Sequence, residues 1–241
     1  MYSMQYVQPE EALALLQEGS QAWNRWRDDH PSVLIDLSAV TIQELDLVGA
    51  NFTDVNLQRT QFSNTVLRQA NFRRAQLQQA DLSNGDYFDA CFKGADLSQA
   101  NCSQASFFGA DLSQTCLNRA EMRGAELFGA NLNQASCQRT NFYQADLTLS
   151  DCSGCNFTEA ILTAADLTGV DLSRANLSYA KLTKATLTGC HFLRTNVQGL
   201  DLQWLNVQAA YGHELVGTDV AEFDLMLPMR QLNRWLHHVK L

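Results

Sequence analysis

Apolar and polar residues follow one another along this chain with a period of five. From Leu37 to Val207, every fifth residue is Leu, Phe or a close apolar relative, which makes thirty-five consecutive pentads. Two residues before most of these central residues lies a small one, as Ala80 lies before Leu82; large residues take this position at the ends of the repeat, and they are Ile35, Val40, Leu45, Leu200 and Leu205. A fixed internal period is typical of stacked repeat architectures, so the repeat governs the interpretation of the whole chain.

The spacing inside one pentad predicts a short strand followed by a corner. The small and the central residue are two apart, so their side chains point to the same side of extended backbone. The residue between them is mostly Asp or Asn, and the two that follow are mostly Ser, Thr, Gln, Arg or Gly, which favour turns. We therefore expect two apolar side chains of each pentad to point inward, and successive coils to pair at about 4.8 Å. The period alone allows a coil of three or of four sides.

The pattern A-[DN]-L-x-x, present as Ala-Asp-Leu-Ser-Asn at 80–84 and Ala-Asn-Leu-Asn-Gln at 130–134, resembles the pentapeptide-repeat family. The resemblance covers residues 35–209. It implies an all-β fold, a right-handed quadrilateral β-helix, with short α-helical caps expected at both ends. Phe88, Phe108 and Phe128 recur at a spacing of 20 directly after the central residue, which favours four sides.

The sequence before the repeat, residues 1–34, predicts an N-terminal helical cap. Pro9 begins a helix that Gly19 ends, and Ser20 is expected to cap a second helix that carries Trp23 and Trp26. This stretch is similar to leaders that precede cyanobacterial pentapeptide repeats. A cap is needed because an open solenoid end exposes strand edges and apolar side chains.

Residues 210–241 predict a C-terminal helical cap in which Pro228 opens a helix. Its apolar stripe has helical spacing, and it consists of Leu232, Trp235, Leu236 and Val239. The stripe either folds onto its own coil or forms a homodimer contact, as the C-terminal end of the rod does in gyrase-binding members of the family.

Composition narrows the choice of partner and compartment. The chain is 46% hydrophobic and 18% charged, with a net charge of −9 and a pI of about 4.9. Such acidity disfavours nucleic acid and anionic membranes as direct partners. The sequence shows no apolar run of membrane-spanning length and no signal peptide at its start, so we expect a cytoplasmic protein.

The sequence predicts no catalytic, cofactor-binding or metal site, and hence no enzyme. It carries no HExxH, GxSxG, P-loop or dinucleotide motif. The seven cysteines fit the repeat: five fall at central or small positions and are interpreted as buried free thiols. The alternative for Cys152 and Cys155, a CxxC pair, is a redox or metal site, but no second pair has zinc spacing.

Two surface features stand out, and both fall on the side whose central residues include Tyr87 and Phe107. The first is the column Phe88, Phe108 and Phe128, which is interpreted either as a partner interface or as a staple between coils. The second is a column of carboxylates, interpreted either as part of that interface or as a solubility surface; its members are Asp46, Asp86, Glu126, Asp146 and Asp166, with Asp89 beside it.

These observations predict a non-enzymatic protein-interaction scaffold built on a repeat rod. The resemblance supplies an alternative, because several members of the family resemble a DNA duplex in width and charge and bind DNA gyrase, a type II topoisomerase. This chain shares the acidity and the rod shape, but it has none of the loop insertions that some of those proteins use.

Overall fold

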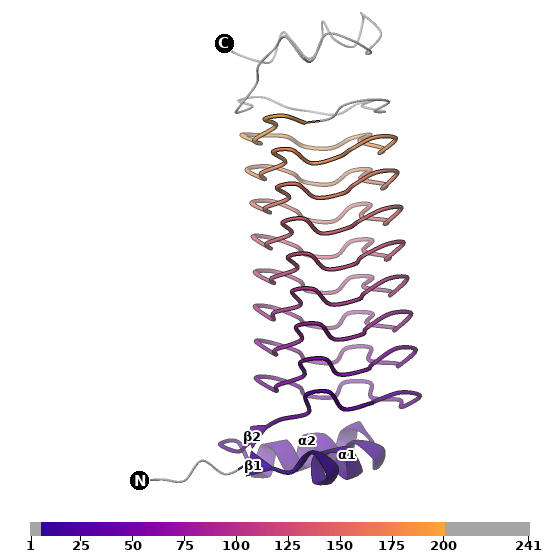
Figure 1. Cartoon of the computed structure of the whole chain (residues 1–241), viewed down its shortest axis with the longest axis vertical. Helices are drawn as coiled ribbons and strands as arrows, with labels where there is room; N and C mark the ends of the chain where they lie inside the picture. Colours follow the sequence, from indigo (N-terminus) through magenta and orange to yellow (C-terminus); the bar gives the residue numbers. More distant parts are fainter. Residues whose placement is uncertain (1–5, 201–241) are drawn as a thin grey trace, which may run out of the picture.

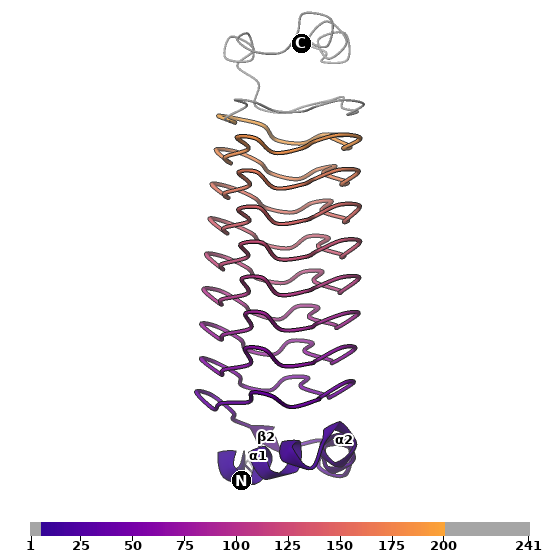
Figure 2. The ribbon, with the colours of Figure 1, turned by 90° about the vertical axis from the view of Figure 1, so that its right-hand side faces the viewer.

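The computed structural model describes residues 6–200, which form a rod of stacked backbone coils (Figure 1). A view turned by 90° shows the same regular stack, so the rod is close to straight (Figure 2). The end of the repeat and the expected C-terminal cap lie outside the described residues, as do the dimer candidates Leu232, Trp235, Leu236 and Val239.

Backbone pairing repeats every twenty residues, which confirms four pentads in each coil. Parallel bridges join Asp36 to Asn56 and continue in the same register to Asn176 and Asn196. In the first of these steps the Leu37 N–H donates to the Asn56 carbonyl at 2.8 Å, and the Asn56 N–H donates back to Ile35 at 3.1 Å. The result is the right-handed quadrilateral β-helix that the sequence predicts.

The corners are β-turns, and from Leu37 to Leu200 all except the one at Ile42–Leu45 are closed by a hydrogen bond from the residue after the corner. The Ala50 N–H donates to the Leu47 carbonyl at 3.0 Å, and the corner residue, Gly49, has a φ of 69°. A positive φ at the third turn residue alone is characteristic of a type II turn. The same left-handed φ recurs at the corner residue of the other pentads, including many that are not glycine, such as Arg59 and Leu149.

Asp and Asn between the small and the central residue stabilise these corners. Every Asp or Asn at this position from Asp36 to Asn196 accepts a hydrogen bond from the backbone N–H two residues later, at 2.8–3.3 Å. This is the local bond that makes Asx residues turn formers. The role that the sequence suggested for these residues, satisfying the turn backbone, is therefore confirmed.

The core is a narrow column filled by the central and small side chains. From Leu37 to Val197 the central residues are at most 3% exposed. In the N-terminal half, aromatic rings stack directly from coil to coil: Phe72 and Phe92 lie 4.6 Å apart, and Tyr87 and Phe107 lie 5.1 Å apart. The small position is crowded by the central side chain of the same pentad: Gly85 lies beside Tyr87, and a Cβ atom on it would lie 2.6 Å from the ring.

Two helices cover the N-terminal end of the column. The strand β1 (Tyr6–Val7) leads into helix α1 (Pro9–Gln17) and helix α2 (Ser20–Asp29), and β2 (Leu34–Ile35) then pairs with β1 in parallel. The helix that begins at Pro9 is present. The expectation that Ser20 caps the second helix is wrong, because Gly19 occupies the N-cap and Ser20 is the first helical residue.

Side chains of α2 replace the hydrogen bonds of a missing coil. The Asn24 amide accepts from the Asn51 N–H at 2.8 Å and donates to the Gly49 carbonyl at 2.9 Å. Trp23 Nε1 donates to the Asn51 carbonyl at 2.8 Å, while its ring, which is fully buried, packs 5.7 Å from that of Phe52. The helix thus covers both the polar edge and the apolar end of the rod.

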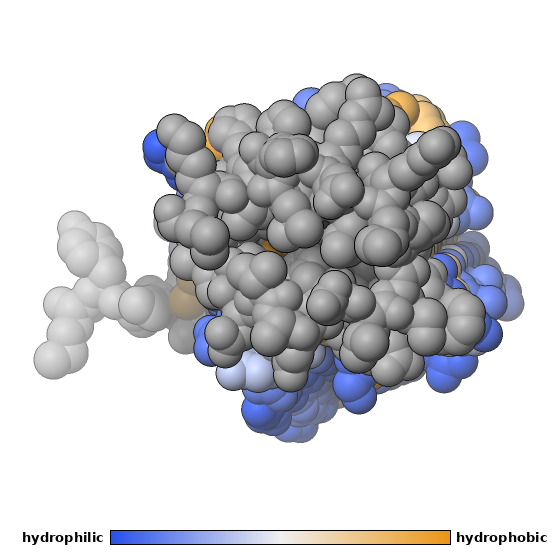
Figure 3. All heavy atoms as spheres, turned by 90° about the horizontal axis from the view of Figure 1, so that it is seen from above, coloured by the Kyte–Doolittle hydropathy of each residue, from blue (hydrophilic) through white to orange (hydrophobic). Residues whose placement is uncertain are grey.

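The outside of the rod is largely polar. Viewed along the long axis, the visible rim of the described coils is mostly hydrophilic (Figure 3). Within residues 6–200, neither helix has the length and apolar character that a membrane crossing requires. One side of the rod departs from this polar character, because exposed apolar side chains gather on it.

Candidate protein-binding face

A column of three stacked phenylalanine rings lies on the outside of one face. We call this the phenylalanine face; its pentads are centred on Leu47, Leu67, Tyr87, Phe107, Leu127, Leu147, Leu167 and Leu187. The Phe88 and Phe108 ring centroids are 5.5 Å apart, and those of Phe108 and Phe128 are 5.1 Å apart, with the ring planes within 15° of parallel. Phe108 is 42% exposed, and the rings on either side of it are half-buried.

The fold places these rings through the pleat of the wall. Tyr87 and Phe107 fill the interior with no exposed surface, so Phe88 and Phe108, one residue later, must point outward. Bridges from Asp86 to Ser106 and on to Glu126 hold the three pentads in register. The sequence-based expectation that the three rings stack on one face agrees with the structure.

Other exposed apolar side chains gather on the same face. The described residues include six large hydrophobic side chains that are clearly exposed, and four of them, Val48, Val66, Phe108 and Leu149, belong to the phenylalanine face. Leu149 extends the apolar surface, but from a corner: its φ is 58°, it is 58% exposed, and it leans over Gly169 of the next coil.

The carboxylates of this face have two roles at once. Asp86, Asp146 and Asp166 each accept the backbone N–H two residues later, which ties them to the turns. Asp86 also accepts from Arg68 at 2.5 Å. Glu126 is exposed and lies between Ser106 and Asp146 in the column, so Glu126, Asp146 and Asp166 form an unbroken acidic run over three coils, while Val66 and Ser106 interrupt it earlier.

Charge is distributed unequally among the four faces. Residues 35–199 contain 16 acidic and 12 basic residues, a net charge of −4 with histidine neutral. The phenylalanine face has one basic residue, Arg68, so its net charge is −5, and the other three faces together have 10 acidic and 11 basic residues, or +1. Its six acidic residues are Asp46, Asp86, Asp89, Glu126, Asp146 and Asp166. The face with the exposed rings is therefore also the acidic face.

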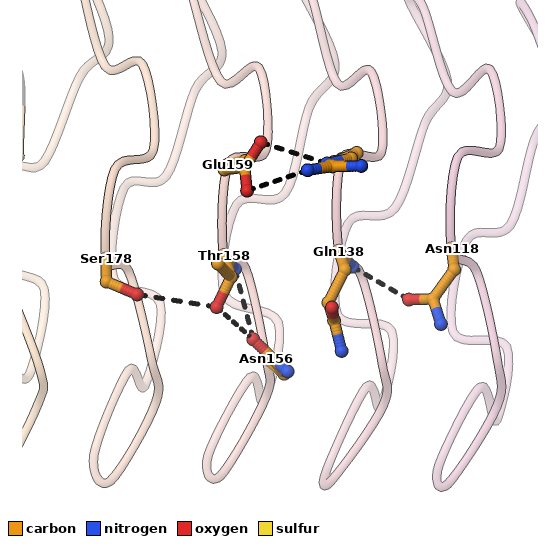
Figure 4. Close-up of polar contacts among 7 residues, drawn as sticks. Asn118, Gln138, Asn156, Thr158, Glu159 and Ser178 are labelled. Carbon is orange, nitrogen blue, oxygen red and sulfur yellow. Dashed lines mark hydrogen bonds and ion pairs between the residues drawn. The ribbon is translucent and has the colours of Figure 1, made fainter.

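A different face carries a polar ladder and a shallow depression. The depression has a volume of about 440 Å³, and Asn118, Gln138, Arg139, Thr158 and Glu159 are among its lining residues. Figure 4 shows Asn118, Gln138 and Thr158 on successive coils. The Gln138 backbone N–H donates to Asn118 Oδ1 of the previous coil at 2.9 Å, and the Ser136 hydroxyl donates to the same oxygen at 2.8 Å. The polar side chains of this depression therefore form hydrogen bonds with residues of the neighbouring coils.

An ion pair at the edge of this depression is bidentate. Arg139 donates to both carboxylate oxygens of Glu159, at 2.9 and 3.1 Å (Figure 4). The hydrogen bond raises the pKa of Arg139 and lowers the pKa of Glu159. Both side chains are about half exposed, so the pair contributes little to stability.

The repeat pattern identifies the family. A model of pentapeptide repeats matches eight copies, over residues 36–84, 88–124, 125–163, 162–194 and 171–204. The chain belongs to the pentapeptide repeat family.

One solved pentapeptide repeat protein is similar in sequence and in overall shape. It is HetL from the cyanobacterium Nostoc sp. strain PCC 7120, described as involved in heterocyst differentiation regulation. It is 29% identical to this chain, with 75% of this chain and 91% of HetL covered and a TM-score of 0.68. No curated protein sequence matches the chain significantly.

Two other pentapeptide repeat structures match less well in shape. QnrB1, a plasmid-mediated fluoroquinolone resistance protein, is 20% identical over 80% of this chain and 98% of its own, with a TM-score of 0.39. A protein of the Arabidopsis thaliana thylakoid lumen is 27% identical over 54% of this chain and 74% of its own, with a TM-score of 0.28.

The cysteines of this pentapeptide repeat protein are free thiols, and five of the seven are buried. Cys155 Sγ donates to the Leu132 carbonyl at 2.7 Å and Cys190 Sγ to the Leu167 carbonyl at 2.9 Å. Burial raises the pKa of the Cys190 thiol to about 12, and it raises the pKa of Cys155 as well. Thiols held protonated in this way are inert packing groups, and no cluster of metal-ligating side chains occurs within residues 6–200.

Sequence reasoning missed the reason for polar residues at small positions. Thr60, Thr65, Thr115, Thr140 and Thr195 donate their hydroxyls to carbonyls of the previous coil, 23 residues earlier, at 2.6–3.0 Å. Cys155 and Cys190 donate in the same way. The signal that could have revealed these bonds is the recurrence of Thr and Cys where Ala is otherwise the rule.

Proposed function

We propose that this pentapeptide repeat protein is a non-enzymatic scaffold that binds a protein partner through the phenylalanine face. The observation that carries the proposal is the exposed column of Phe88, Phe108 and Phe128, on a rod whose visible rim is mostly hydrophilic when viewed along its axis (Figure 3). Contiguous exposed apolar surface of this kind is typical of interaction sites. The interior is already filled by Tyr87 and Phe107, so filling the core does not explain the outer rings.

The competing interpretation is that the rings only staple the coils together. Their centroid distances of 5.1 and 5.5 Å show real stacking, which contributes some stability. Stapling does not account for the other features of this face. Exposed Val48, Val66 and Leu149 make no ladder of this kind, and the concentration of carboxylates adds nothing to ring stacking.

The test replaces all three rings together. The variant Phe88→Ser/Phe108→Ser/Phe128→Ser should remain folded, because Ser already occupies the equivalent position in other pentads, as in Ser83, Ser98 and Ser103. We expect it to lose proteins that the wild type captures from a lysate of the source organism. Capture would be compared by mass spectrometry, and circular dichroism would confirm that the coils persist.

A matched control removes an outer aromatic residue from another face. Tyr143 occupies the outward position and packs against Arg123 at 5.3 Å. Tyr143→Ser should leave the captured proteins unchanged. If the triple variant also captures the same proteins as the wild type, the phenylalanine face is not the binding surface and the proposal fails.

The alternative function, a DNA mimic that binds a type II topoisomerase, has weaker support. Duplex DNA carries one charge for about every 1.7 Å of its axis. About eight coils at roughly 4.8 Å would match a length of duplex with more than twenty charges. Residues 35–199 have a net charge of −4, and most of the excess acidity lies on one face. Strong inhibition of gyrase supercoiling by the wild type would favour the alternative.

A further inference from the structure

We propose that the phenylalanine face binds a basic amphipathic helix of its protein partner, with the helix axis parallel to the rod. This inference rests on the proposed function and adds the shape and charge of the segment that binds. Three properties of the face carry it: its charge, the spacing of its rings, and the open space at one end of their column.

The charge of the face calls for a basic partner. Its net charge is −5, against +1 for the other three faces together. Within the part of the chain that the structure describes, the ion pair on this face joins Arg68 to Asp86. Arg68 is the one basic residue of this face, so Asp89, Glu126, Asp146 and Asp166 have no further basic residue on it. Lysine or arginine beside an apolar stripe would complement them, which favours encounter and orientation.

The spacing of the rings matches a helix better than a strand. The centroid distances are 5.5 and 5.1 Å along the rod. An α-helix places side chains of one stripe at intervals of about 5.4 Å, one turn. An extended strand places same-side residues about 6.6 Å apart, so it would lose register by more than 1 Å at each coil. A helix with apolar residues one turn apart therefore stays in step with all three rings, as helix-in-groove recognition requires.

Open space at Gly129, at one end of the column of rings, allows a close approach. The corner residues after Phe108 and Phe128 are Gly109 and Gly129. Apart from the neighbours of Gly129 in the chain, no atom lies within 4 Å of the point where its Cβ atom would be, whereas the same point at Gly109 lies 2.5 Å from the Asp89 carboxylate. Beyond Phe128 the outward positions are taken by Thr148 and Thr168, which are short, and Leu149 supplies a further apolar contact.

A second copy of this chain is a poorer occupant of the face. Pairing two phenylalanine faces would place two surfaces of net charge −5 against each other, and like charges across an interface are unfavourable. Pairing with another described face would offer a surface close to neutral. A basic segment from a different protein avoids both difficulties.

The test uses three synthetic peptides of about twenty residues, long enough to form a helix. The first has leucines at helical spacing flanked by lysines and arginines. The second has glutamates in place of all the basic residues, and the third has the composition of the first in an order that destroys the apolar stripe. Binding to the full-length protein would be measured by isothermal titration calorimetry. We expect the first peptide to bind at least about tenfold more tightly than the other two.

Variants of the protein locate the binding. Phe88→Ser/Phe108→Ser/Phe128→Ser should weaken binding of the first peptide by about tenfold or more. Glu126→Gln should weaken it severalfold, whereas Glu121→Gln, an exposed residue at the equivalent position of another face, should leave it unchanged. Equal binding of the first and third peptides, or equal effects of the two Glu→Gln variants, would overturn the inference, because attraction between opposite charges alone would then explain binding.

Failure here can be told apart from failure of the proposed function. If the triple serine variant loses its captured proteins but the first peptide does not bind selectively, the scaffold function stands and the helix is wrong. If capture is unchanged by the triple variant, both are wrong. Sedimentation that shows a dimer in the wild type and a monomer in the triple variant would assign the face to a second copy and overturn the helix.

Discussion

Phe107 and Phe108 are neighbours in the chain, yet they lie on opposite sides of the same wall. Phe107 is fully buried, stacked 5.1 Å from Tyr87 in the column that fills the rod. Phe108 is 42% exposed and stacked 5.1 Å from Phe128 outside it. The distances agree because the coil spacing sets both, so ring stacking by itself does not distinguish a residue needed for folding from one available for binding.

The inner column of rings, which includes Phe107, and the outer column, which includes Phe108, differ in how much of each ring is buried from water. An interior ring is transferred completely out of water and touches coils above, below and across. An outer ring keeps much of its surface in solvent and contacts mainly the rings of the same column. The fold depends on the first kind of ring and can accept polar residues in place of the second.

The largest effect should come from changing the phase of the repeat. One residue inserted after Ser113 would move Glu126 to the central position and Leu127 to the outward one, so that polar residues face inward and apolar residues face outward in the rest of the repeat. We expect loss of cooperative folding in thermal melts followed by circular dichroism. A melt like that of the parent would contradict the coil architecture.

Longer insertions at the same point distinguish the role of the inner column of rings in folding from the role of the outer column in binding. Five added residues of repeat sequence keep inside and outside in phase but move Phe128 to the next face, away from Phe108. Twenty added residues, one full coil, keep inside and outside in phase and also keep Phe128 on the same face as Phe108. We expect both variants to fold. The insertion of five residues should weaken partner capture more than the insertion of twenty residues.

A smaller contrast compares the neighbours directly. Phe107→Ala removes a buried ring and should lower the free energy of unfolding by about 3–5 kcal/mol. Phe108→Ala removes two stacked pairs worth about 0.2–1 kcal/mol each, so its cost should stay below about 2 kcal/mol. Chemical denaturation of the two variants side by side gives the comparison. Equal costs would show that the outer ladder is as important for stability as the inner one.

Replacing Gly85 or Gly129 by alanine should lower the stability of the fold, but for a different physical reason at each position. In Gly85→Ala the new Cβ atom meets the Tyr87 ring at 2.6–2.8 Å, and overpacking of this kind costs about 1–3 kcal/mol. In Gly129→Ala there is free space, and the cost of about 1 kcal/mol comes from its φ of 64°. Tyr87→Leu should relieve the first variant only, which denaturation of the double variants would reveal.

The smallest expected change is a gain. The Tyr87 hydroxyl is buried without a hydrogen-bond partner within the described part of the chain, and burial raises its pKa well above the usual value. Because an unsatisfied buried hydroxyl is unfavourable, Tyr87→Phe should raise the free energy of unfolding by about 1 kcal/mol. A clear loss of stability would show that the hydroxyl has a partner inside the rod.

The period of five predicted which residues face inward, and Leu82, Phe92 and Cys102 all lie where it places them. It did not determine the number of sides, because three- and four-sided coils share the same local pattern. That choice became visible from the spacing of 20 between Phe88 and Phe108, and the pairing of Asp36 with Asn56 then settled it.

The candidate site was only partly visible in the sequence. The column of Phe88, Phe108 and Phe128 could be named from its register alone. The concentration of net charge on that face could be found only once every residue had been assigned to one of four faces. The contacts of Trp23 and Asn24 with the first coil could not be predicted, because they depend on how α2 crosses Gly49–Thr53 in space.

The Asn24 amide has a consequence for assembly. A β-solenoid end is a template on which another chain can add strands, and repeated addition produces fibres. At Gly49–Thr53 the N–H of Asn51 and the carbonyl of Gly49 are already bonded to a side chain, and Arg27 donates to the Thr53 carbonyl at 2.8 Å. Trp23 Nε1 donates to the Asn51 carbonyl of the same segment, so three side chains of α2 block the addition of another strand at this edge.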